Sequence, residues 1–231
     1  MPFMDNTGTL YIVATPIGNL EDITLRALRI LKEVDCVLCE DTRTTARLLE
    51  KYDIHTKTMS YHAHSTGAKE SVIIRMLKEG KNLALVSDAG TPCISDPGVL
   101  LVSNVRKELP DSLIVPIPGA SALISALSAS GISSSEFVFL GFLPHKKGRE
   151  TLFKEIASSP RVNVFYESTH RIMKTLTSLD KYSPDSTVMI AREITKQFEE
   201  FVKGTPIEVF NYFTTNKDKQ RGEYVVIVVP K

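Results

Sequence analysis

The fold of this chain is decided by the stretch Val86-Ser87-Asp88-Ala89-Gly90-Thr91-Pro92-Cys93-Ile94-Ser95-Asp96-Pro97-Gly98. The apolar run that leads into it, residues 82–86, is long enough for a buried strand and too short for a helix. Asp96 and Pro97 have the pattern of a helix N-cap and a first helical residue. A loop that only connects a strand to a helix in the core needs fewer residues than this one. The side chains of this loop also contribute little apolar surface to a core. We therefore expect a small-molecule site that the backbone approaches closely at Gly90, with a long surface turn as the alternative.

Short apolar runs alternate with segments of helical periodicity through the first half of the chain. Asp22 or Thr24 is expected to cap the helix that ends at Glu33. The expected strands are residues 10–14, 35–39, 57–61, 82–86 and 113–117, each followed by a turn and a helix. This alternation predicts a parallel α/β sheet with crossover helices.

The second half begins with a strand that has no helix directly before its turn. Strands are expected at residues 137–143, 161–166, 187–190, 199–202 and 223–229. Helices are expected from a cap at Ser168 to Leu179 and from Pro206 onward. We therefore predict a two-lobed α/β protein, with a mostly parallel sheet in residues 1–117 and a mixed sheet in residues 118–231. The ligand is expected in a cleft between the two lobes.

Composition excludes several classes of function. The formal net charge of +1 provides no global field for nucleic acid or anionic membrane, so any such site must be local. No apolar run approaches the ~18 residues of a membrane span, and the first residues lack a signal-peptide pattern. Cys36 and Cys39 lie three residues apart on an expected strand, so they point to opposite faces and we expect no metal site. An odd number of cysteines, three, fits a reduced, cytoplasmic location.

Charged side chains gather where expected strands end. The charged groups of Glu40-Asp41-Thr42-Arg43 have two alternative roles. They could belong to a functional site, or they could equally form a helix cap and an i,i+3 ion pair. The densest basic run, His145-Lys146-Lys147-Gly148-Arg149, is typical of a solvated loop, and it is the first place to expect phosphate contacts if RNA binds. Neither G-x-G-x-x-G nor Gly-Lys-Ser/Thr follows the first strand, which argues against a dinucleotide or a nucleoside triphosphate.

Seven motifs, in this order and at this spacing, resemble the tetrapyrrole methylase superfamily. They are residues 10–24 (LYIVATPIGNLEDIT), 40–43 (EDTR), 86–92 (VSDAGTP), 95–98 (SDPG), 118–122 (PGASA), 165–171 (FYESTHR) and 191–196 (AREITK). The resemblance extends from about Leu10 to Val229. Within the superfamily it is to the branch that methylates a ribose 2′-oxygen of a cytidine in the decoding region of 16S rRNA.

The resemblance implies S-adenosylmethionine bound between two lobes, S-adenosylhomocysteine as product, and a homodimer. This cofactor is a sulfonium nucleoside with an amino-acid end, so it needs close backbone approach rather than a phosphate cradle. Thr169 stands where the family usually has proline, so the family's exact turn is not carried over to this position. Many members continue beyond the last expected strand, so part of the usual RNA footprint is expected to be missing. The cofactor positions carried over are Pro16, Ile17, Ser87, Asp88, Thr91, Ser121, Ala122, Tyr166 or Glu167, and Ala191.

Methyl transfer to a ribose hydroxyl requires alignment of oxygen, methyl and sulfur, and assistance by a base because the hydroxyl does not ionise near neutral pH. The candidate bases are charged groups at strand ends and stay unranked. They are Asp41, Glu167, Glu193 and Lys196. Phosphates of the RNA are expected to contact Arg43, Arg171 and Arg192 together with Lys146, Lys147 and Arg149 of the basic run.

Two other functions stay open. A methylase of a corrinoid or porphyrin precursor would share the fold and the cofactor, although residues 40–43 and 165–171 resemble the rRNA branch. A non-catalytic RNA-binding assembly factor would keep the basic run but could lose the cofactor loops, which are intact in this sequence.

Overall fold

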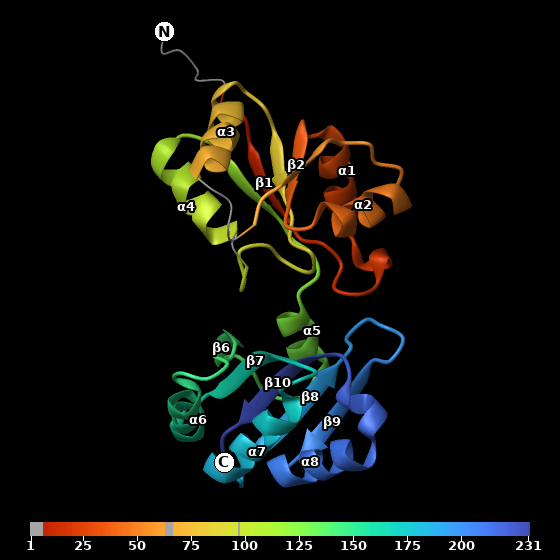
Figure 1. The fold of residues 1–231 in the computed structure, drawn as a ribbon, viewed down its shortest axis with the longest axis vertical. Helices are drawn as coiled ribbons and strands as arrows, with labels where there is room; N and C mark the ends of the chain where they lie inside the picture. Colours follow the sequence, from red (N-terminus) through yellow and green to blue (C-terminus); the bar gives the residue numbers. More distant parts are fainter. Residues whose placement is uncertain (1–6, 63–66, 97) are drawn as a thin grey trace. The chain divides into compact units, whose positions relative to one another are not determined.

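The chain divides into two compact units, Met1–Ser121 and Ala122–Lys231, each built on its own five-stranded sheet (Figure 1). This computed structural model describes residues 7–62, 67–96 and 98–231. The first six residues, which lack a signal-peptide pattern, and Pro97, expected at the start of a helix, lie outside the described residues. Within the described ranges, no helix combines the length and the apolar character needed to cross a bilayer.

The sheet of the first unit is entirely parallel, as predicted. Its strand order is β3-β2-β4-β1-β5. The strands are β1 (Leu10–Val13), β2 (Cys36–Cys39), β3 (Thr58–Ser60), β4 (Leu83–Leu85) and β5 (Ile114–Ile117). Every residue of β2 and β4 is buried, because helices cover both faces of a parallel sheet and leave no position for polar side chains.

Helices α1 (Leu25–Glu33) and α2 (Thr42–Lys51) cover one face of this sheet, and α3 (Gly67–Lys78) and α4 (Gly98–Glu108) cover the other (Figure 1). A short 3-10 turn, η1 (Leu20–Asp22), precedes α1. Of the two expected caps, Thr24 is the one that caps α1, and its hydroxyl accepts a hydrogen bond from Ala27 N at 3.1 Å. Cys39 packs in the core under α1 and α2, and Cys36 packs under α3 and α4. The prediction that the two thiols face opposite sides is therefore confirmed.

The sheet of the second unit is mixed, which confirms the predicted fold class. Its order is β6-β7-β10-β8-β9, with β6 and β7 parallel and the other neighbours antiparallel. The strands are β6 (Phe137–Phe142), β7 (Val162–Ser168), β8 (Thr187–Arg192), β9 (Glu200–Gly204) and β10 (Glu223–Val229).

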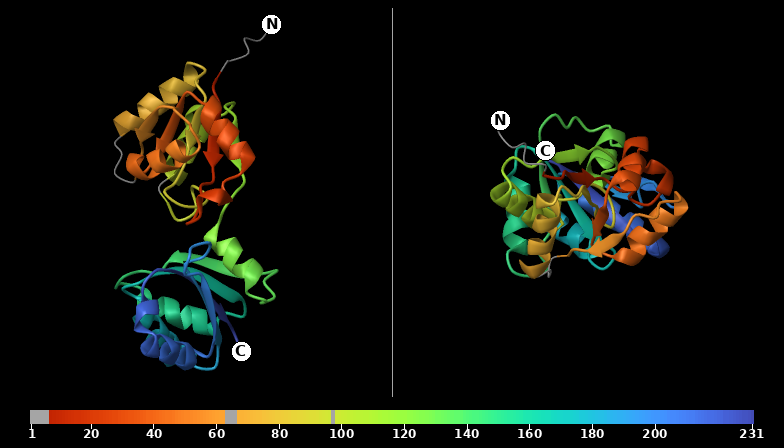
Figure 2. Two further views of the ribbon diagram at one scale, coloured as in Figure 1. Left: turned by 90° about the vertical axis from the view of Figure 1, so that its right-hand side faces the viewer. Right: turned by 90° about the horizontal axis from the view of Figure 1, so that it is seen from above.

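Helices also cover both faces of the second sheet (Figure 2). Helix α5 (Ala122–Ala129) contacts β10 on one face. Helices α6 (Arg149–Ser158), α7 (Ile172–Tyr182) and α8 (Pro206–Thr215) enclose the core on the other face, and a 3-10 turn, η2 (Lys217–Gln220), follows α8. The predicted cap of α7 at Ser168 is wrong, because β7 continues through Ser168 and the residue that precedes the first turn of α7 is Arg171.

Candidate functional site

A pair of backbone hydrogen bonds joins the segments that follow β1 and β4. Thr15 N donates to Gly90 O at 2.9 Å, and Gly90 N donates to Thr15 O at 3.0 Å. Thr15 Oγ1 also donates to Ser87 O at 3.0 Å, and Ser87 Oγ donates to Gly90 O at 3.1 Å. All three residues are buried. The long loop that follows β4 is therefore fixed against the loop that follows β1.

Two glycines let the loop after β5 approach the same place. Gly90 has φ +84°, and a Cβ atom there would lie 3.3 Å from Ile17 Cγ2 and 3.7 Å from Ala120 O. A Cβ atom on Gly119 would lie 2.8 Å from Ala14 Cβ, closer than side chains allow. The three loops thus meet closely where these two glycines lie, and the positive φ of Gly90 and the crowding at Gly119 favour glycine there.

All cofactor candidates of the first unit lie on these three loops. Thr91 Oγ1 donates to Ala120 O at 3.1 Å, which ties the loop after β4 to the loop after β5. Asp88 is exposed, and its Oδ1 accepts from Asp41 N at 3.1 Å, which adds the end of β2. The candidates are Pro16 and Ile17 after β1, Ser87, Asp88 and Thr91 after β4, and Ser121 after β5.

The strand order places these loops at a topological switch point. From β1 the chain crosses to β2, beyond β4, whereas from β4 it crosses back over β1 to β5. Helix α1 after β1 and helix α4 after β4 consequently cover opposite faces of the sheet. Open α/β sheets bind ligands outside the carboxyl ends of the strands at such a point.

Asp41, at the end of β2, caps α2 and pairs with Arg43. Its Oδ1 accepts from Arg43 N at 2.8 Å, and its Oδ2 lies 2.8 Å from Arg43 Nη2. The hydrogen bonds from the Arg43 side chain and backbone lower the pKa of Asp41 to about 2. The Arg43 side chain is 87% exposed. The expected helix cap is confirmed, whereas the ion pair of Arg43 is with Asp41, two residues away, and not the expected i,i+3 pair. A carboxyl as acidic as that of Asp41 is a weak proton acceptor.

Glu40, which was not among the candidate residues, is a further carboxyl near these loops. Burial raises its pKa, and the negative charges of Asp96 and Asp88 raise it further. Carboxyls with a raised pKa gather at sites of proton transfer. The usable signal in the sequence was the position of Glu40 directly after a buried strand, beside the strand that leads to Asp88.

In the second unit, Tyr166 and Ala191 lie in one row across the sheet. Tyr166 of β7 and Ala191 of β8 are both paired with Val225 of β10. Residues paired directly across antiparallel strands share a face of the sheet. Helix α5, which begins at Ala122, contacts β10 on the face away from the core of α6, α7 and α8. The three cofactor candidates of the second unit are therefore associated with the same face.

The next residues along these strands point to the opposite face. Glu167 and Arg192 are both paired with Tyr224, which belongs to the core under α6, α7 and α8. Glu167 is 1% exposed and Arg192 is 8% exposed. Because side chains alternate along a strand, the sheet separates Glu167 and Arg192 from Tyr166 and Ala191.

Three arginines expected to hold RNA phosphates make contacts inside the second unit. Arg149 Nη2 lies 3.3 Å from Glu167 Oε2, and Arg171 Nε lies 2.7 Å from Glu167 Oε1. The side chains of Arg149 and Arg171 are each 13% exposed. Arg192 donates to the backbone oxygens of residues 221 and 198, at 2.8 and 3.0 Å. Lys146 and Lys147, by contrast, are exposed.

Glu193 and Lys196 form an ion pair in the loop after β8. Lys196 Nζ lies 3.0 Å from Glu193 Oε1 and 2.7 Å from Glu223 Oε2. Burial opposes ionisation of Glu193, but a hydrogen bond from Glu223 N and the charge of Lys196 give it a lowered pKa. Burial likewise opposes the charge of Lys196, but Glu223 and Glu193 raise its pKa. Near neutral pH, Glu193 is ionised and Lys196 is protonated, so Glu193 is the proton acceptor of the two.

The backbone of this loop is held in an unusual conformation. Glu193 and Thr195 have φ values of +49° and +66°, in the left-handed region that favours glycine. The Glu193 side chain fills the space beside Gly222, where a Cβ atom would lie 2.7 Å from Glu193 Cγ. Thr169, which replaces the proline of the resemblance, fixes the same glycine by donating to Gly222 O at 2.8 Å and accepting from Gly222 N at 2.9 Å. Strain of this kind is often found at functional sites.

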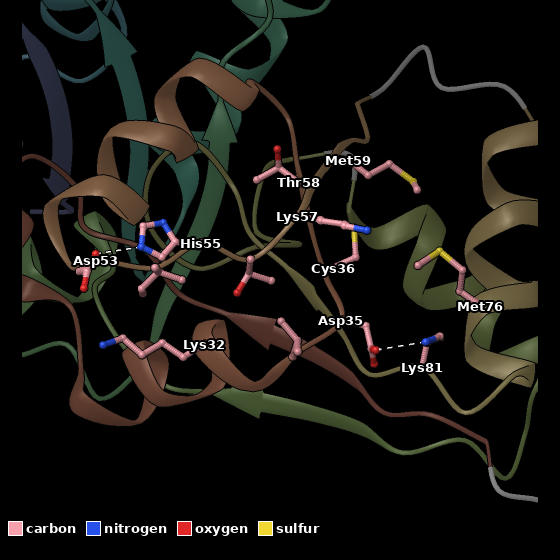
Figure 3. A pocket seen from close by; sticks show the side chains of 13 residues that line it. Lys32, Asp35, Cys36, Asp53, His55, Lys57, Thr58, Met59, Met76 and Lys81 are labelled. Carbon is pink, nitrogen blue, oxygen red and sulfur yellow. Dashed lines mark hydrogen bonds and ion pairs between the residues drawn. The ribbon is translucent and has the colours of Figure 1, made fainter.

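A pocket of about 770 Å³ lies at the amino ends of β2 and β3 in the first sheet (Figure 3). Its lining includes Cys36 and two close pairs of side chains. Asp35 Oδ1 lies 3.4 Å from Lys81 Nζ, and Asp53 Oδ1 lies 2.9 Å from His55 Nε2. None of the cofactor or base candidates is among its lining residues, so it is separate from the loops at the carboxyl ends.

A family model described as "Tetrapyrrole (Corrin/Porphyrin) Methylases" matches residues 9–209. The chain belongs to the tetrapyrrole methylase family. Solved structures that resemble this tetrapyrrole methylase include the methyltransferase CobJ, with a TM-score of 0.71 and 16% identity, covering 97% of this chain and 95% of that chain. Another is a uroporphyrin-III C-methyl transferase from Thermus thermophilus complexed with S-adenyl homocysteine, with a TM-score of 0.66 and 19% identity, covering 96% of this chain and 97% of that chain. At such identities the likeness shows the fold alone.

Curated relatives of this tetrapyrrole methylase are much more similar in sequence. The protein named ribosomal RNA small subunit methyltransferase I from Halalkalibacterium halodurans is 46% identical over 97% of this chain and 76% of its own length. The protein of the same name from Thermotoga maritima is 46% identical over 97% of this chain and 99% of its own length. The Escherichia coli O157:H7 protein of that name is 45% identical over 97% of this chain and 79% of its own length.

Proposed function

We propose that this tetrapyrrole methylase transfers a methyl group from S-adenosylmethionine to the 2′-oxygen of a cytidine in the decoding region of 16S rRNA. The observation that carries the proposal is the 46% identity, across 97% of the chain, to proteins named ribosomal RNA small subunit methyltransferase I. Such a reaction belongs in the cytoplasm, where small ribosomal subunits are assembled.

The loops of the first unit fit the proposed cofactor. They offer backbone groups, the three hydroxyls of Ser87, Thr91 and Ser121, and the exposed Asp88 carboxylate at a switch point, with glycines at the places of closest approach. This set of neutral groups and one anion suits a cationic nucleoside with an amino-acid end. When bound, the cofactor supplies a methyl group activated by sulfonium. Its proposed contacts are Pro16, Ile17, Ser87, Asp88, Thr91 and Ser121, with Ala122, Tyr166 and Ala191 of the second unit.

Glu193 is the proposed acceptor of the ribose proton. It is ionised near neutral pH, its side chain is 17% exposed, and the left-handed backbone and Lys196 hold it in place. Lys196 stays protonated and keeps the carboxylate oriented. Asp41, whose pKa is about 2, and Glu167, whose carboxylate is 0% exposed, are poorer acceptors.

The RNA contacts are proposed for the cationic side chains that remain exposed. Arg43, Lys146 and Lys147 are such side chains. Since the net charge of the chain is +1, these local groups must supply the attraction to phosphate. The enzyme is further proposed to act as a homodimer, as the resemblance implies.

Labelled S-adenosylmethionine, offered with small ribosomal subunits isolated from cells that lack the enzyme, tests the proposed function. We expect label in 16S rRNA and a single position that resists alkaline cleavage, because a methylated 2′-oxygen cannot attack its own phosphate. Label transferred only to an added porphyrin or corrinoid precursor would replace the proposal with the small-molecule alternative. Binding of subunits without any transfer would indicate an assembly factor.

The Glu193→Gln variant tests the proposed base. We expect its kcat to fall by about 10²- to 10⁴-fold, the usual contribution of general base catalysis, while its dissociation constant for the cofactor stays close to that of the wild type. Calorimetry with S-adenosylhomocysteine provides the second measurement. Wild-type turnover in this variant would contradict the assignment.

A further inference from the structure

One carboxylate, Glu167, binds four groups in the interior of the second unit. Its Oε1 lies 2.7 Å from Arg171 Nε and accepts from Ser168 N at 2.8 Å. Its Oε2 accepts from Thr175 Oγ1 at 2.6 Å and from Arg149 Nη2 at 3.3 Å. The carboxylate is 0% exposed, so both oxygens are fully engaged away from solvent.

The two arginines held by Glu167 bind the first turn of the basic loop, residues 144–148. Arg171 Nη1 donates to Leu143 O at 2.7 Å, and Arg149 Nη1 donates to Pro144 O at 3.1 Å. Arg149 Nη2 also donates to Thr175 Oγ1 at 2.6 Å, which anchors it on α7. Leu143 is buried, whereas every residue from 144 to 148 is exposed. The loop is thus fixed at its base by guanidinium groups and projects its own side chains outward.

The far end of the basic loop is fixed as well. Gly148 has φ +83° and precedes α6, and Arg149 N donates to Lys146 O at 3.2 Å. The lysines at 146 and 147 therefore stand between two anchored points rather than on a free segment. Ordering a charged side chain before binding reduces the entropy that binding must remove.

We propose that Glu167 is a positioning residue that holds the basic loop in the shape that presents Lys146 and Lys147 to an rRNA phosphate. This inference rests on the proposed function. Glu167 acts through Arg149 and Arg171 on the far side of the sheet from Tyr166, so it neither accepts the ribose proton nor contacts the cofactor. Arg149 and Arg171, in turn, shape the loop instead of meeting the phosphates themselves.

The Glu167→Gln variant, compared with a Lys146→Ala/Lys147→Ala double variant, tests this role. An amide cannot pair with two guanidiniums, so we expect KM for the small subunit to rise about tenfold through weakened phosphate contacts, with kcat within about twofold of wild type. The double variant should raise KM similarly and reduce the slope of log KM against log salt by about two. Adding Glu167→Gln to the double variant should change KM little, because the lysines that it positions are then absent. Glu155→Gln, an exposed carboxylate of α6, serves as the matched control.

Each other outcome overturns the inference. A kcat reduced 100-fold or more at unchanged KM would make Glu167 the base. The effects of Glu167→Gln and of the double variant on KM could multiply when the three substitutions are combined. Alternatively, Glu167→Gln could weaken binding of S-adenosylhomocysteine as much as it raises KM. Either result would show general destabilisation of the protein. If Glu167→Gln does not fold, Arg149→Lys keeps the charge but loses the bond to Pro144 O, and it must show the same rise in KM and the same lack of additivity. Wild-type transfer to 16S rRNA is measured in parallel, so failure of the proposed function is seen separately.

Discussion

Gly90 combines a left-handed backbone with close contact to two other loops. Replacement by alanine should lower the free energy of unfolding by about 1–2 kcal/mol, because an L side chain is strained at this φ. It should also weaken binding of S-adenosylhomocysteine. The added Cβ atom would lie 3.3 Å from Ile17 Cγ2 and would push the Ile17 side chain aside. Gly131 has φ +65° with open space around it, so Gly131→Ala is a matched control that carries the strain alone. Equal cofactor affinity in both variants, measured by calorimetry, would contradict the role given to Gly90.

The pair of Asp41 and Arg43 should contribute to the pH dependence of stability. The pKa of Asp41 is lowered in the folded state, from 3.8 to about 2, by hydrogen bonds from Arg43. A lowered carboxyl pKa stabilises the folded state above the unfolded pKa, and this contribution is lost as the pH falls from about 4 toward 2. Asp41→Asn keeps a capping side chain but lacks the charge. We expect the wild type to be the more stable at pH 7, with the difference in urea unfolding shrinking below pH 4. A difference that is constant with pH would refute the assignment.

Sequence alone could predict which residues carry charge at strand ends, but not what each charge contacts. Arg149 and Arg171 resemble phosphate ligands until the fold brings both onto Glu167, which is 18 residues from Arg149. A buried carboxylate requires partners, and the sequence does not reveal that Glu167 is buried beside both arginines. For Asp41 the local pattern sufficed, because its partner is two residues away.

At the scale of elements, helix α8 depends on its N-terminal capping box. Thr205 Oγ1 accepts from Glu208 N at 3.4 Å, Glu208 Oε2 accepts from Thr205 N at 2.8 Å, and Pro206 occupies the first turn. We expect Thr205→Ala to lower the free energy of unfolding by about 1 kcal/mol, as measured by urea denaturation. Thr214→Ala on the exposed side of the same helix should change it by less than about 0.5 kcal/mol. Equal effects of the two substitutions would argue against the cap.

Most of the strands were predictable because they are short apolar runs bounded by turn residues, although β3 and β9 are more polar. The ends of the elements were harder. The expected cap at Ser168 was wrong because Ser168 still pairs with Glu223 as part of β7. No element was expected between residues 149 and 158, yet α6 begins directly at the end of the basic run. Its buried residues, Phe153 and Ile156, are only two and lie three apart, so the helical period is weak.

At the scale of the whole molecule, the proposed homodimer predicts a sedimentation mass twice that of the 25.6 kDa chain. Large apolar side chains remain exposed on the single chain, among them Leu25 at 85% and Leu113 at 65%. Exposed apolar area of this kind is common at subunit interfaces. Analytical ultracentrifugation at micromolar concentration provides the measurement. A single-chain mass at every concentration would remove the dimer from the proposal.

The activity could be anticipated from the order of motifs, whereas physical reasoning on the residues alone stops at a small-molecule site. The reason lies in the proposed cofactor, because a neutral adenosine with a sulfonium leaves no glycine fingerprint comparable to that of a pyrophosphate. The three loops around Thr15, Gly90 and Ala120 come together only in the folded sheet.

The position of β10 sets the order in which a newly made chain can mature. All strands of the first sheet have been translated by residue 117, so that half can acquire its structure while the rest is still being synthesised. The second sheet cannot, because β10 is its middle strand and joins β7 to β8. Until residues 223–229 emerge, Tyr166 and Ala191 have no shared neighbour. A nascent chain that still lacks residues 223–229 therefore cannot complete the second sheet.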